Sequence, residues 1–183
     1  MSYKTVLEIR ENCDLILSEE AVTSAVNRVI ESIKKDYKAL NPLMLVVMNG
    51  GLFFAADVLR GCDFALCLDY VHASRYGNKT TGSSLSWFAT PKSDLTGRDV
   101  LVLDDILDGG ITLAGIKEYC YLQGANSVQT VVFANKHVAR QSGGLEVADF
   151  VGTDIPDRYV FGYGMDYQGA WRQLKEVYAI SES

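Results

Sequence analysis

The sequence predicts an α/β fold built on a doubly wound, mainly parallel sheet. Short apolar runs rich in β-branched residues indicate buried strands, at residues 43–48, 64–73, 100–105 and 127–136. Segments with apolar residues at helical spacing alternate with them, at 18–37, 52–60 and 111–124. Near-continuous apolar strands that alternate with helices are typical of a parallel sheet covered on both faces.

The first predicted helix covers residues 18–37. Ser18 is placed to cap it, and Glu19 and Glu20 fall in the first turn, where negative charge is favourable. Apolar residues form one face at Val22, Ala25, Val26, Val29, Ile30 and Ile33. The segment is therefore predicted to be an amphipathic helix.

A glycine turn follows two of the predicted strands and leads into a helix. The strand at 43–48 is closed by residues 49–51 (Asn-Gly-Gly), and the strand at 100–105 is followed by a Gly-Gly pair at 109–110. Gly124 is expected to end the helix that follows the second turn. Ligands of open α/β sheets bind beyond the carboxyl ends of the strands, so these turns are candidate binding sites.

Two segments do not fit as core elements. Residues 74–97 are rich in Gly, Ser, Thr and Lys and too long for a plain connection, which indicates either a mobile functional loop or a long hairpin. Residues 149–174 are rich in aromatic and turn residues and are expected to form a small cap over one edge of the sheet. We expect a single domain over residues 1–183, with its core at about 38–140.

Composition excludes several classes of protein. The chain has 183 residues, a net charge of −6 and 48% hydrophobic residues, so no excess of Lys and Arg is available for a nucleic acid or an anionic membrane. No run approaches the roughly 20 apolar residues of a membrane span, and the N-terminus lacks the pattern of a secretory signal. We therefore expect a cytoplasmic protein. Reduced structural thiols are expected at Cys13, Cys62, Cys67 and Cys120, which lack Cys-x-x-Cys spacing.

The candidate chemistry concentrates in VLVLDDILDGGITL, residues 100–113. The Gly-Gly turn enters a helix, so free backbone N–H groups, the helix dipole and the Thr112 hydroxyl can surround a phosphate. Asp104 and Asp105 would repel a phosphate, but they can accept from sugar hydroxyls or hold Mg²⁺ through water. A ribose 5-phosphate satisfies both groups, with Asp108 placed to exchange a proton on the other side of the sugar.

Other interpretations of these residues are possible. Acids after a strand are common helix caps and Gly-Gly is common in turns, but a cap does not require two consecutive acids and a third three residues later. A phosphoryl-accepting receiver-like domain also uses clustered aspartates and a strand-end lysine. Its acid pair belongs to the first strand, whereas the acids here follow a late strand, so the phosphoribosyl interpretation is favoured.

VLVLDDILDGGITL resembles the phosphoribosyl-pyrophosphate signature of type I phosphoribosyltransferases: an apolar strand, two acids, two apolar residues, Asp, two small residues, any residue and Thr. Further stretches resemble the hypoxanthine/guanine branch of that superfamily, namely VVMNGGLFFAADVLR, SRYGNKTTG, VVFANK and DFVGTDIPDRYVFGYGMDYQGAWRQL. The resemblance extends over roughly residues 40–181. It implies a Mg²⁺-dependent transferase of purine salvage that joins a 6-oxopurine (hypoxanthine, guanine or xanthine) to phosphoribosyl pyrophosphate and releases pyrophosphate.

The same resemblance implies an overall organisation. It implies a flexible loop at about 74–97 and a purine-binding hood from about 149–183 together with the N-terminal segment. It also implies a homodimer or homotetramer, with the helix at 18–37 or the segment 49–60 as candidate interfaces.

The resemblance assigns the ribose and the 5-phosphate to the central motif. Asp104 and Asp105 are implied to hold the ribose hydroxyls, and the 5-phosphate is implied to be surrounded by Asp108, Gly109, Gly110, Ile111 and Thr112. Asp108 is the implied general acid/base near N7 of the purine, a proton transfer worth about 10²–10⁴-fold in rate.

Pyrophosphate contacts are implied in two other segments. Asn49 and Gly50 occupy the position of the family's pyrophosphate loop, in which the peptide bond between Met48 and Asn49 would be cis. Arg75 and Tyr76 belong to the loop that is expected to close over the site and exclude water.

The tail supplies the remaining charged candidates. Arg172 is implied to contact pyrophosphate, and Asp166 and Asp104 are implied ligands of Mg²⁺. Arg140 is a weaker candidate for the same anion or for a subunit contact.

Purine contacts are implied at the end of the strand 127–136 and in the tail. Lys136 is implied to donate to O6 of the purine, which favours an oxopurine over adenine. Tyr159 is implied to stack on the base, with the main chain of Val160 at its edge and Asp166 beside it.

Three positions depart from the family pattern. Asn49 replaces a frequent Lys, Arg75 a frequent Ser, and Gly109 a usual Thr or Ser. The alternative function is a catalytically inactive, phosphoribosyl-pyrophosphate-binding regulator on the same fold. Such a regulator is expected to carry a basic patch or a nucleic-acid module, and this acidic sequence shows neither.

Overall fold

The computed structural model describes residues 9–75 and 85–181. Its core is a six-stranded sheet in the order β4-β3-β2-β5-β6-β7, in which every neighbouring pair is parallel except β3 and β4. The strands are β2 (Leu43–Val47), β3 (Cys67–Arg75), β4 (Leu85–Ala89), β5 (Asp99–Leu107), β6 (Ser127–Lys136) and β7 (Phe150–Ile155). The doubly wound, mainly parallel α/β class predicted from the sequence is confirmed.

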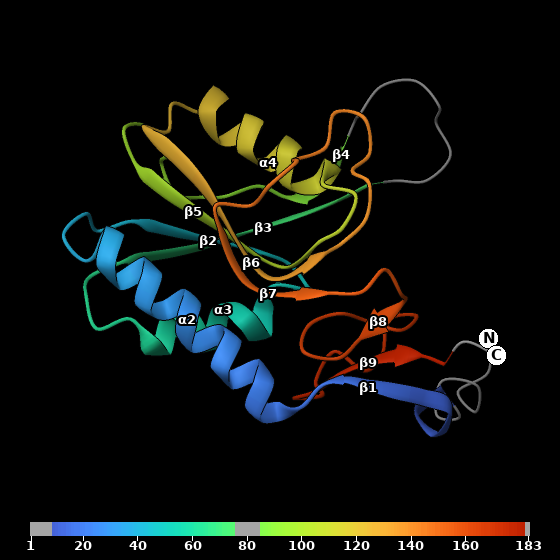
Figure 1. The fold of residues 1–183 in the computed structure, drawn as a ribbon. Helices are drawn as coiled ribbons and strands as arrows, with labels where there is room; N and C mark the ends of the chain where they lie inside the picture. The colour runs from blue at the N-terminus through green and yellow to red at the C-terminus, as the bar shows by residue number, and fades with distance from the viewer. Residues whose placement is uncertain (1–8, 76–84, 182–183) are drawn as a thin grey trace.

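Helices cover both faces of this sheet (Figure 1). Helices α2 (Glu19–Tyr37) and α3 (Leu52–Gly61) lie on one face, and α4 (Ile111–Leu122) lies on the other. All five residues of β2 are buried, because alternate side chains enter the two cores: Met44 and Val46 pack on the α2/α3 side, and the other three on the α4 side. None of the described helices combines the length and apolar composition needed to cross a membrane.

The observed boundaries lie close to the predicted ones. Ser18 caps α2 by accepting from the N–H of Ala21 at 3.3 Å, as expected. Helix α4 is followed by Gly124 at φ +85°, a conformation that favours glycine. Strand β3 begins at Cys67 rather than at residue 64, so the first residues of that apolar run are not part of the strand.

A second, smaller sheet forms the hood, defined here as β1 and residues 156–181. Its order is β1-β9-β8, all antiparallel, with β1 (Cys13–Leu17) following a 3₁₀ turn at Ile9–Asn12, and with β8 (Val160–Phe161) and β9 (Val177–Ile180). Figure 1 shows it beside β7 at one end of the main sheet. The Tyr163 hydroxyl donates to Asp57 of α3 at 2.7 Å and ties the hood to the core.

The core is larger than the predicted range of 38–140. Residues 150–155, expected in the cap, form β7 and extend the main sheet by pairing with β6. Helix α2 also belongs to the core, and its Arg28 donates to the carbonyl of Gly152 in β7 at 2.9 Å. The short, glycine-containing sequence of β7 gave no clear strand pattern, so only its long-range pairing defines it.

The segment 74–97 begins at the end of one arm of a hairpin, β3, and contains the other arm, β4. Strand β4 pairs antiparallel with β3, from His72 opposite Ala89 to Arg75 opposite Leu85. The connection at 76–84, which includes Tyr76, lies outside the described residues.

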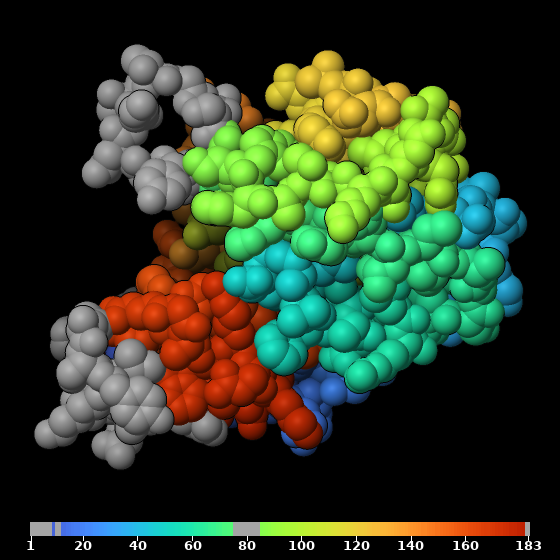
Figure 2. Space-filling view, turned by 180° about the vertical axis from the view of Figure 1, so that it is seen from behind, coloured from blue at the N-terminus to red at the C-terminus, as the bar shows by residue number. Residues whose placement is uncertain are grey.

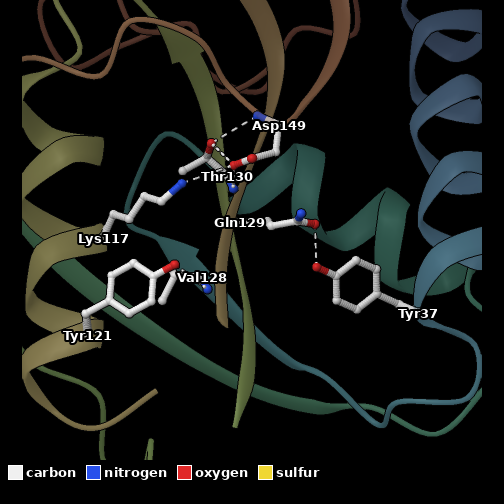
Figure 3. A network of polar contacts seen from close by, with 7 residues as sticks. All are labelled: Tyr37, Lys117, Tyr121, Val128, Gln129, Thr130 and Asp149. Carbon is white, nitrogen blue, oxygen red and sulfur yellow. Dashed lines mark hydrogen bonds and ion pairs between the residues drawn. The ribbon is translucent and has the colours of Figure 1, made fainter. Parts of the chain in front are cut away.

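A polar network fixes the start of β7 against β6 and α4 (Figure 3). The Asp149 carboxylate accepts from the backbone N–H of Thr130 at 2.7 Å and from its hydroxyl at 2.9 Å, and it lies 3.4 Å from the ammonium of Lys117. Thr130 is fully buried, so its polar groups depend on this carboxylate for partners.

We expect Asp149→Ala to lower the free energy of unfolding by about 1–3 kcal/mol, because it removes the acceptor of two buried donors. Urea denaturation measures the change. Asp149→Asn keeps one oxygen and should lose less, and Glu31→Ala, whose side chain is 75% exposed, should change stability by less than about 0.5 kcal/mol. Equal losses for Asp149→Ala and Glu31→Ala would contradict the account.

Candidate active site

The carboxyl ends of parallel strands meet at one edge of the sheet. The ends of β2, β5 and β6 meet there, and the hood covers them from the side. A cavity of about 450 Å³ is lined by residues 47–50, 72–74 and 104–113 together with Gln141, Asp166 and Arg172. In the space-filling view, a recess separates the orange and red surface of the hood from the green surface of the sheet (Figure 2).

A second cavity of about 190 Å³ adjoins the first. It lies between the end of β6 and the hood and is lined by Lys136, Arg158, Tyr159, Val160 and Met165. Both cavities are also lined by Asp105, Ile106, Asp108 and Asp166. The site is therefore one depression with a larger and a smaller compartment, and Asp108 lies at their boundary.

The acid pair lies inside β5, which continues two residues beyond the predicted end of the strand. Asp104 and Asp105 are each only 8% exposed, and the N–H of Asp105 donates to an oxygen of Asp104 at 2.9 Å. Burial raises the pKa of both carboxyl groups, and the neighbouring Asp105 carboxylate raises that of Asp104 further; the Arg172 guanidinium opposes both shifts. Hydroxyl donors or a cation bound beside the pair would offset the free-energy cost of burying the two carboxylates.

Backbone from two other segments packs against Asp105. A Cβ atom on Gly50 would lie 2.2 Å from Oδ2 of Asp105, and a Cβ atom on Gly164 would lie 2.3 Å from the carbonyl oxygen of Gly50. Gly164 has φ +100°, which also favours glycine. The backbones of the turn after β2 and of the hood thus touch each other, and both lie against the Asp105 side chain.

The turn after β5 forms the end of the larger compartment. Gly110, at φ +80°, precedes the first residue of α4, and both Ile111 and Thr112 line the cavity. The N–H groups of a helix's first turn have no intrahelical acceptor, and the helix dipole is positive at this end. The arrangement suits an anion.

The turn after β2 faces the same cavity. The peptide bond between Met48 and Asn49 is cis, the conformation that the resemblance implied. The N–H of Met48 donates to Val71 of β3 at 2.8 Å, and that of Gly51 donates to Val47 at 2.9 Å. A Cβ atom on Gly51 would lie 2.6 Å from the carbonyl oxygen of Leu103, so glycine is needed for this approach to β5.

Lys136 lies between two carboxylates in the smaller compartment. Its ammonium is 3.6 Å from Asp108 and 3.2 Å from Asp157, and its side chain is 14% exposed. A strand-end lysine that is only a solvated charge would be far more exposed. Tyr159 and Val160 line the same compartment, and the Tyr159 side chain is exposed to solvent.

Asp166 and Arg172, predicted separately, form a pair. Their charged groups are 2.6 Å apart, and the other Asp166 oxygen accepts from the N–H of Gly169 at 2.6 Å. The Arg172 guanidinium also donates to the carbonyl of Gly164 at 2.6 Å. The pair therefore fixes the hood turn at the edge of the larger compartment.

The structure gathers most of the predicted site residues. Asp104, Asp105, Asp108, Asn49, Gly50, Lys136 and Arg172 line the two compartments with the glycine turn. Arg75 ends β3, but its side chain, like Tyr76, lies outside what the structure describes. Arg140 does not enter either cavity and donates to backbone carbonyls instead, so its prediction as an anion contact is wrong.

Three residues at or beside the site were not predicted: Gln141, Asp157 and Gly164. Gln141 lines the larger compartment, and Asp157 pairs with Lys136. Only Gly164 had a signal in the sequence, the repeated glycines of FGYG, which indicate unusual backbone conformations.

Known proteins resemble this chain over most of its length. The phosphoribosyl transferase domain matches residues 13–168 of the chain. A hypoxanthine-guanine phosphoribosyltransferase of Bacillus subtilis (strain 168) is 33% identical over 164 residues, which cover 89% of this chain and 90% of that protein. One from Aquifex aeolicus (strain VF5) is 32% identical over 179 residues, or 96% of this chain and 99% of the relative.

Solved structures extend the likeness to three dimensions. A crystal structure of a hypoxanthine phosphoribosyltransferase from Staphylococcus aureus matches with a TM-score of 0.87 and 26% sequence identity, covering 95% of both chains. The resemblance identified from the sequence is confirmed, and the chain belongs to the phosphoribosyltransferase domain family.

Proposed function

We propose that the protein is a purine-salvage transferase that moves the phosphoribosyl group of phosphoribosyl pyrophosphate to N9 of hypoxanthine or guanine, with xanthine as a further candidate base. The products are the nucleoside monophosphate, IMP or GMP, and pyrophosphate. One observation carries the proposal: two adjoining compartments share Asp108, the larger suited to a sugar phosphate and the smaller to a planar base. The names of the two curated relatives support it.

The larger compartment supplies the groups that a ribose 5-phosphate needs. The turn at 108–112 would surround the phosphate with N–H groups at the start of α4. Asp104 and Asp105 would accept from the ribose 2- and 3-hydroxyls, whose donors would offset the burial of the pair. The sugar's anomeric carbon would then face the boundary between the compartments.

The smaller compartment supplies the groups that act on the base. Lys136 would donate to O6, and adenine would be disfavoured because its amino group leaves the ammonium unpaired. Tyr159 would stack on the ring and the main chain of Val160 would meet its edge. The Asp108 carboxylate, 3.6 Å from the Lys136 ammonium, would exchange a proton at N7 while N9 attacks.

Pyrophosphate would lie between the cis-peptide turn and Arg172. The N–H groups near Asn49 and Gly50 and the Arg172 guanidinium would donate to it. Arg75 and Tyr76 are proposed to contact pyrophosphate from the adjoining loop. Arg75 would add a positive charge, which Asn49 does not supply.

We propose Mg²⁺ as the cofactor, held by Asp166 and, through water, by Asp104. Among the side chains that the structure describes, no three from His, Cys, Asp or Glu cluster as a metal site. That suits Mg²⁺, which usually keeps several waters and binds one or two carboxylates plus substrate phosphates. When bound, the ion would neutralise pyrophosphate as a leaving group.

The alternative of an inactive regulator has no observation in its favour. The relatives reported above are named as enzymes, and the net charge of −6 is unsuited to a nucleic-acid partner. A cytoplasmic location is proposed because all four cysteines are free thiols, the usual state in a reducing compartment.

The purified protein is expected to form nucleotide from phosphoribosyl pyrophosphate, Mg²⁺ and hypoxanthine or guanine, and not from adenine. Asp108→Asn should lower kcat by about 10²–10⁴-fold, because the amide cannot exchange the proton. Product formation followed by absorbance or chromatography gives both results. Glu118, on α4 and outside both cavities, provides the control Glu118→Gln, which should leave kcat unchanged.

No turnover of any base, together with tight binding of phosphoribosyl pyrophosphate, would reject the enzyme and favour the regulator. Turnover that Asp108→Asn retains would leave the enzyme but reject the proposed role of Asp108.

We further propose a homo-oligomer assembled through an apolar groove between α3 and β3. The groove has a volume of about 570 Å³ and is lined almost entirely by apolar side chains. Three of them are strongly exposed: Leu52 at 45%, Leu68 at 59% and Tyr70 at 47%. The cyan to green surface that these elements form faces the viewer in Figure 2. Contiguous exposed apolar surface of this kind marks interfaces.

The protein is therefore expected to have at least twice the 20.1 kDa mass of the chain in solution, and Leu68→Glu should shift it toward 20.1 kDa. Size-exclusion chromatography with light scattering measures both masses. Leu122→Glu, at a 76% exposed apolar residue on α4, is the matched control and should leave the mass unchanged. A monomeric wild-type protein, or an oligomer unaffected by Leu68→Glu, would reject the groove as the interface.

A further inference from the structure

The Arg140 side chain connects the ends of β5 and β6 beneath the candidate site. Its Nη1 atom donates to the carbonyl oxygens of Leu107 at 3.2 Å, Asp108 at 2.7 Å and Lys136 at 3.0 Å. Its Nε atom donates to the carbonyl of Glu146 at 3.2 Å. The third nitrogen, Nη2, donates to the side chain of Asn135.

These contacts join the two residues that the proposed function assigns to the base. Asp108 and Lys136 come from different strands, and their charged groups are 3.6 Å apart. The backbone of each is held by the same nitrogen of Arg140. The guanidinium therefore fixes the distance between the two strand ends. It thereby also fixes the distance between the Asp108 carboxylate and the Lys136 ammonium.

Neighbouring residues of the same segment complete the contact with the turn. The N–H of Gln141 donates to the carbonyl of Gly109 at 3.1 Å, and the N–H of Leu145 donates to that of Gly110 at 3.0 Å. A Cβ atom on Gly144 would lie 2.3 Å from the carbonyl oxygen of Gly109, so the two backbones touch. All four carbonyls from residue 107 to residue 110 thus face the segment 140–145.

That orientation determines where the N–H groups of the turn point. In a trans peptide the C=O and N–H bonds point in opposite directions. The carbonyls of residues 107–110 belong to the same peptide groups as the N–H groups of residues 108–111. With the carbonyls turned toward the segment 140–145, these N–H groups are directed away from it, toward the cavity that residues 108–111 line.

We propose that Arg140 is a positioning residue for the reaction, which acts through the backbone of Asp108 and Lys136 rather than on the substrate. The inference rests on the proposed function and adds to it a residue that touches neither compartment. A lysine could not replace Arg140, because its single ammonium could not reach the two strand ends, the carbonyl of Glu146 and the side chain of Asn135 at the same time.

Arg140→Lys is expected to lower kcat about 10²-fold, the effect of displacing a reacting group by about 1 Å, and to raise KM for phosphoribosyl pyrophosphate. The change in kcat should act through Asp108. In an Asp108→Asn background, Arg140→Lys should therefore lower kcat by less than about 3-fold, while the rise in KM remains.

Two further variants separate positioning from general stability. Arg28→Lys is the matched control, because Arg28 also donates to a backbone carbonyl, that of Gly152, far from the site; its kcat should be unchanged. Asn135→Ala removes one partner of the guanidinium and keeps the arginine. If Arg140→Lys does not fold, Asn135→Ala should show the same pattern with a smaller fall in kcat.

Equal losses of kcat in the wild-type and Asp108→Asn backgrounds would overturn the inference and leave Arg140 as a stabilising contact only. So would a wild-type kcat for folded Arg140→Lys. Full activity of Asp108→Asn alone would instead reject the proposed role of Asp108, so the two failures are distinguishable.

Discussion

The site depends on one costly feature, two adjacent carboxyl groups buried at the end of β5. Asp104 and Asp105 are nearly inaccessible, and burial raises the pKa of both. A sequence selected for stability alone would place apolar residues there, as in the preceding residues 100–103, which are completely buried. Retaining two acids makes sense where a ligand supplies hydroxyl donors or a cation that offset the burial.

The surrounding structure can be understood as support for that pair. Gly50 and Gly164 allow backbone from the turn after β2 and from the hood to lie against Asp105. The Tyr163 hydroxyl, bound to Asp57, and the Arg172 guanidinium, bound to the carbonyl of Gly164, hold the hood in that position. The segment 140–145 supports the neighbouring turn from below. The parallel sheet places these contacts together because its strand ends share one edge.

The sequence predicted the parts of this arrangement that local patterns encode. The apolar run, the acids and the glycine turn of residues 100–113 lie close together in the chain, so their spacing alone indicated a strand, a binding turn and a helix. The complete burial of β2 likewise follows from five consecutive apolar residues. Family resemblance added the cis peptide after Met48, which the residues alone do not indicate.

Contacts between distant segments could not be predicted in the same way. Strand β7 is defined by its pairing with β6. The hood sheet is formed when β1 and β9, from opposite ends of the chain, pair with each other. Arg140 has the charge of an anion ligand, and only the fold shows that backbone carbonyls use its donors. Asp157 was missed for the same reason, because its partner Lys136 lies 21 residues earlier in the sequence.

The most direct test of this account is the thermal unfolding of the Asp104→Asn/Asp105→Asn variant, with and without phosphoribosyl pyrophosphate and Mg²⁺. Aspartates whose pKa is raised by folding destabilise the free protein at neutral pH, so the amides should raise its Tm, by about 2–4 °C for each kcal/mol relieved. The ligands should raise the Tm of the wild type by more than that of the variant, because the acceptors for the ribose are weakened while the phosphate contacts remain. A variant that melts below the wild type and is stabilised by the ligands as much as the wild type would contradict the claim that the pair is buried for the substrate.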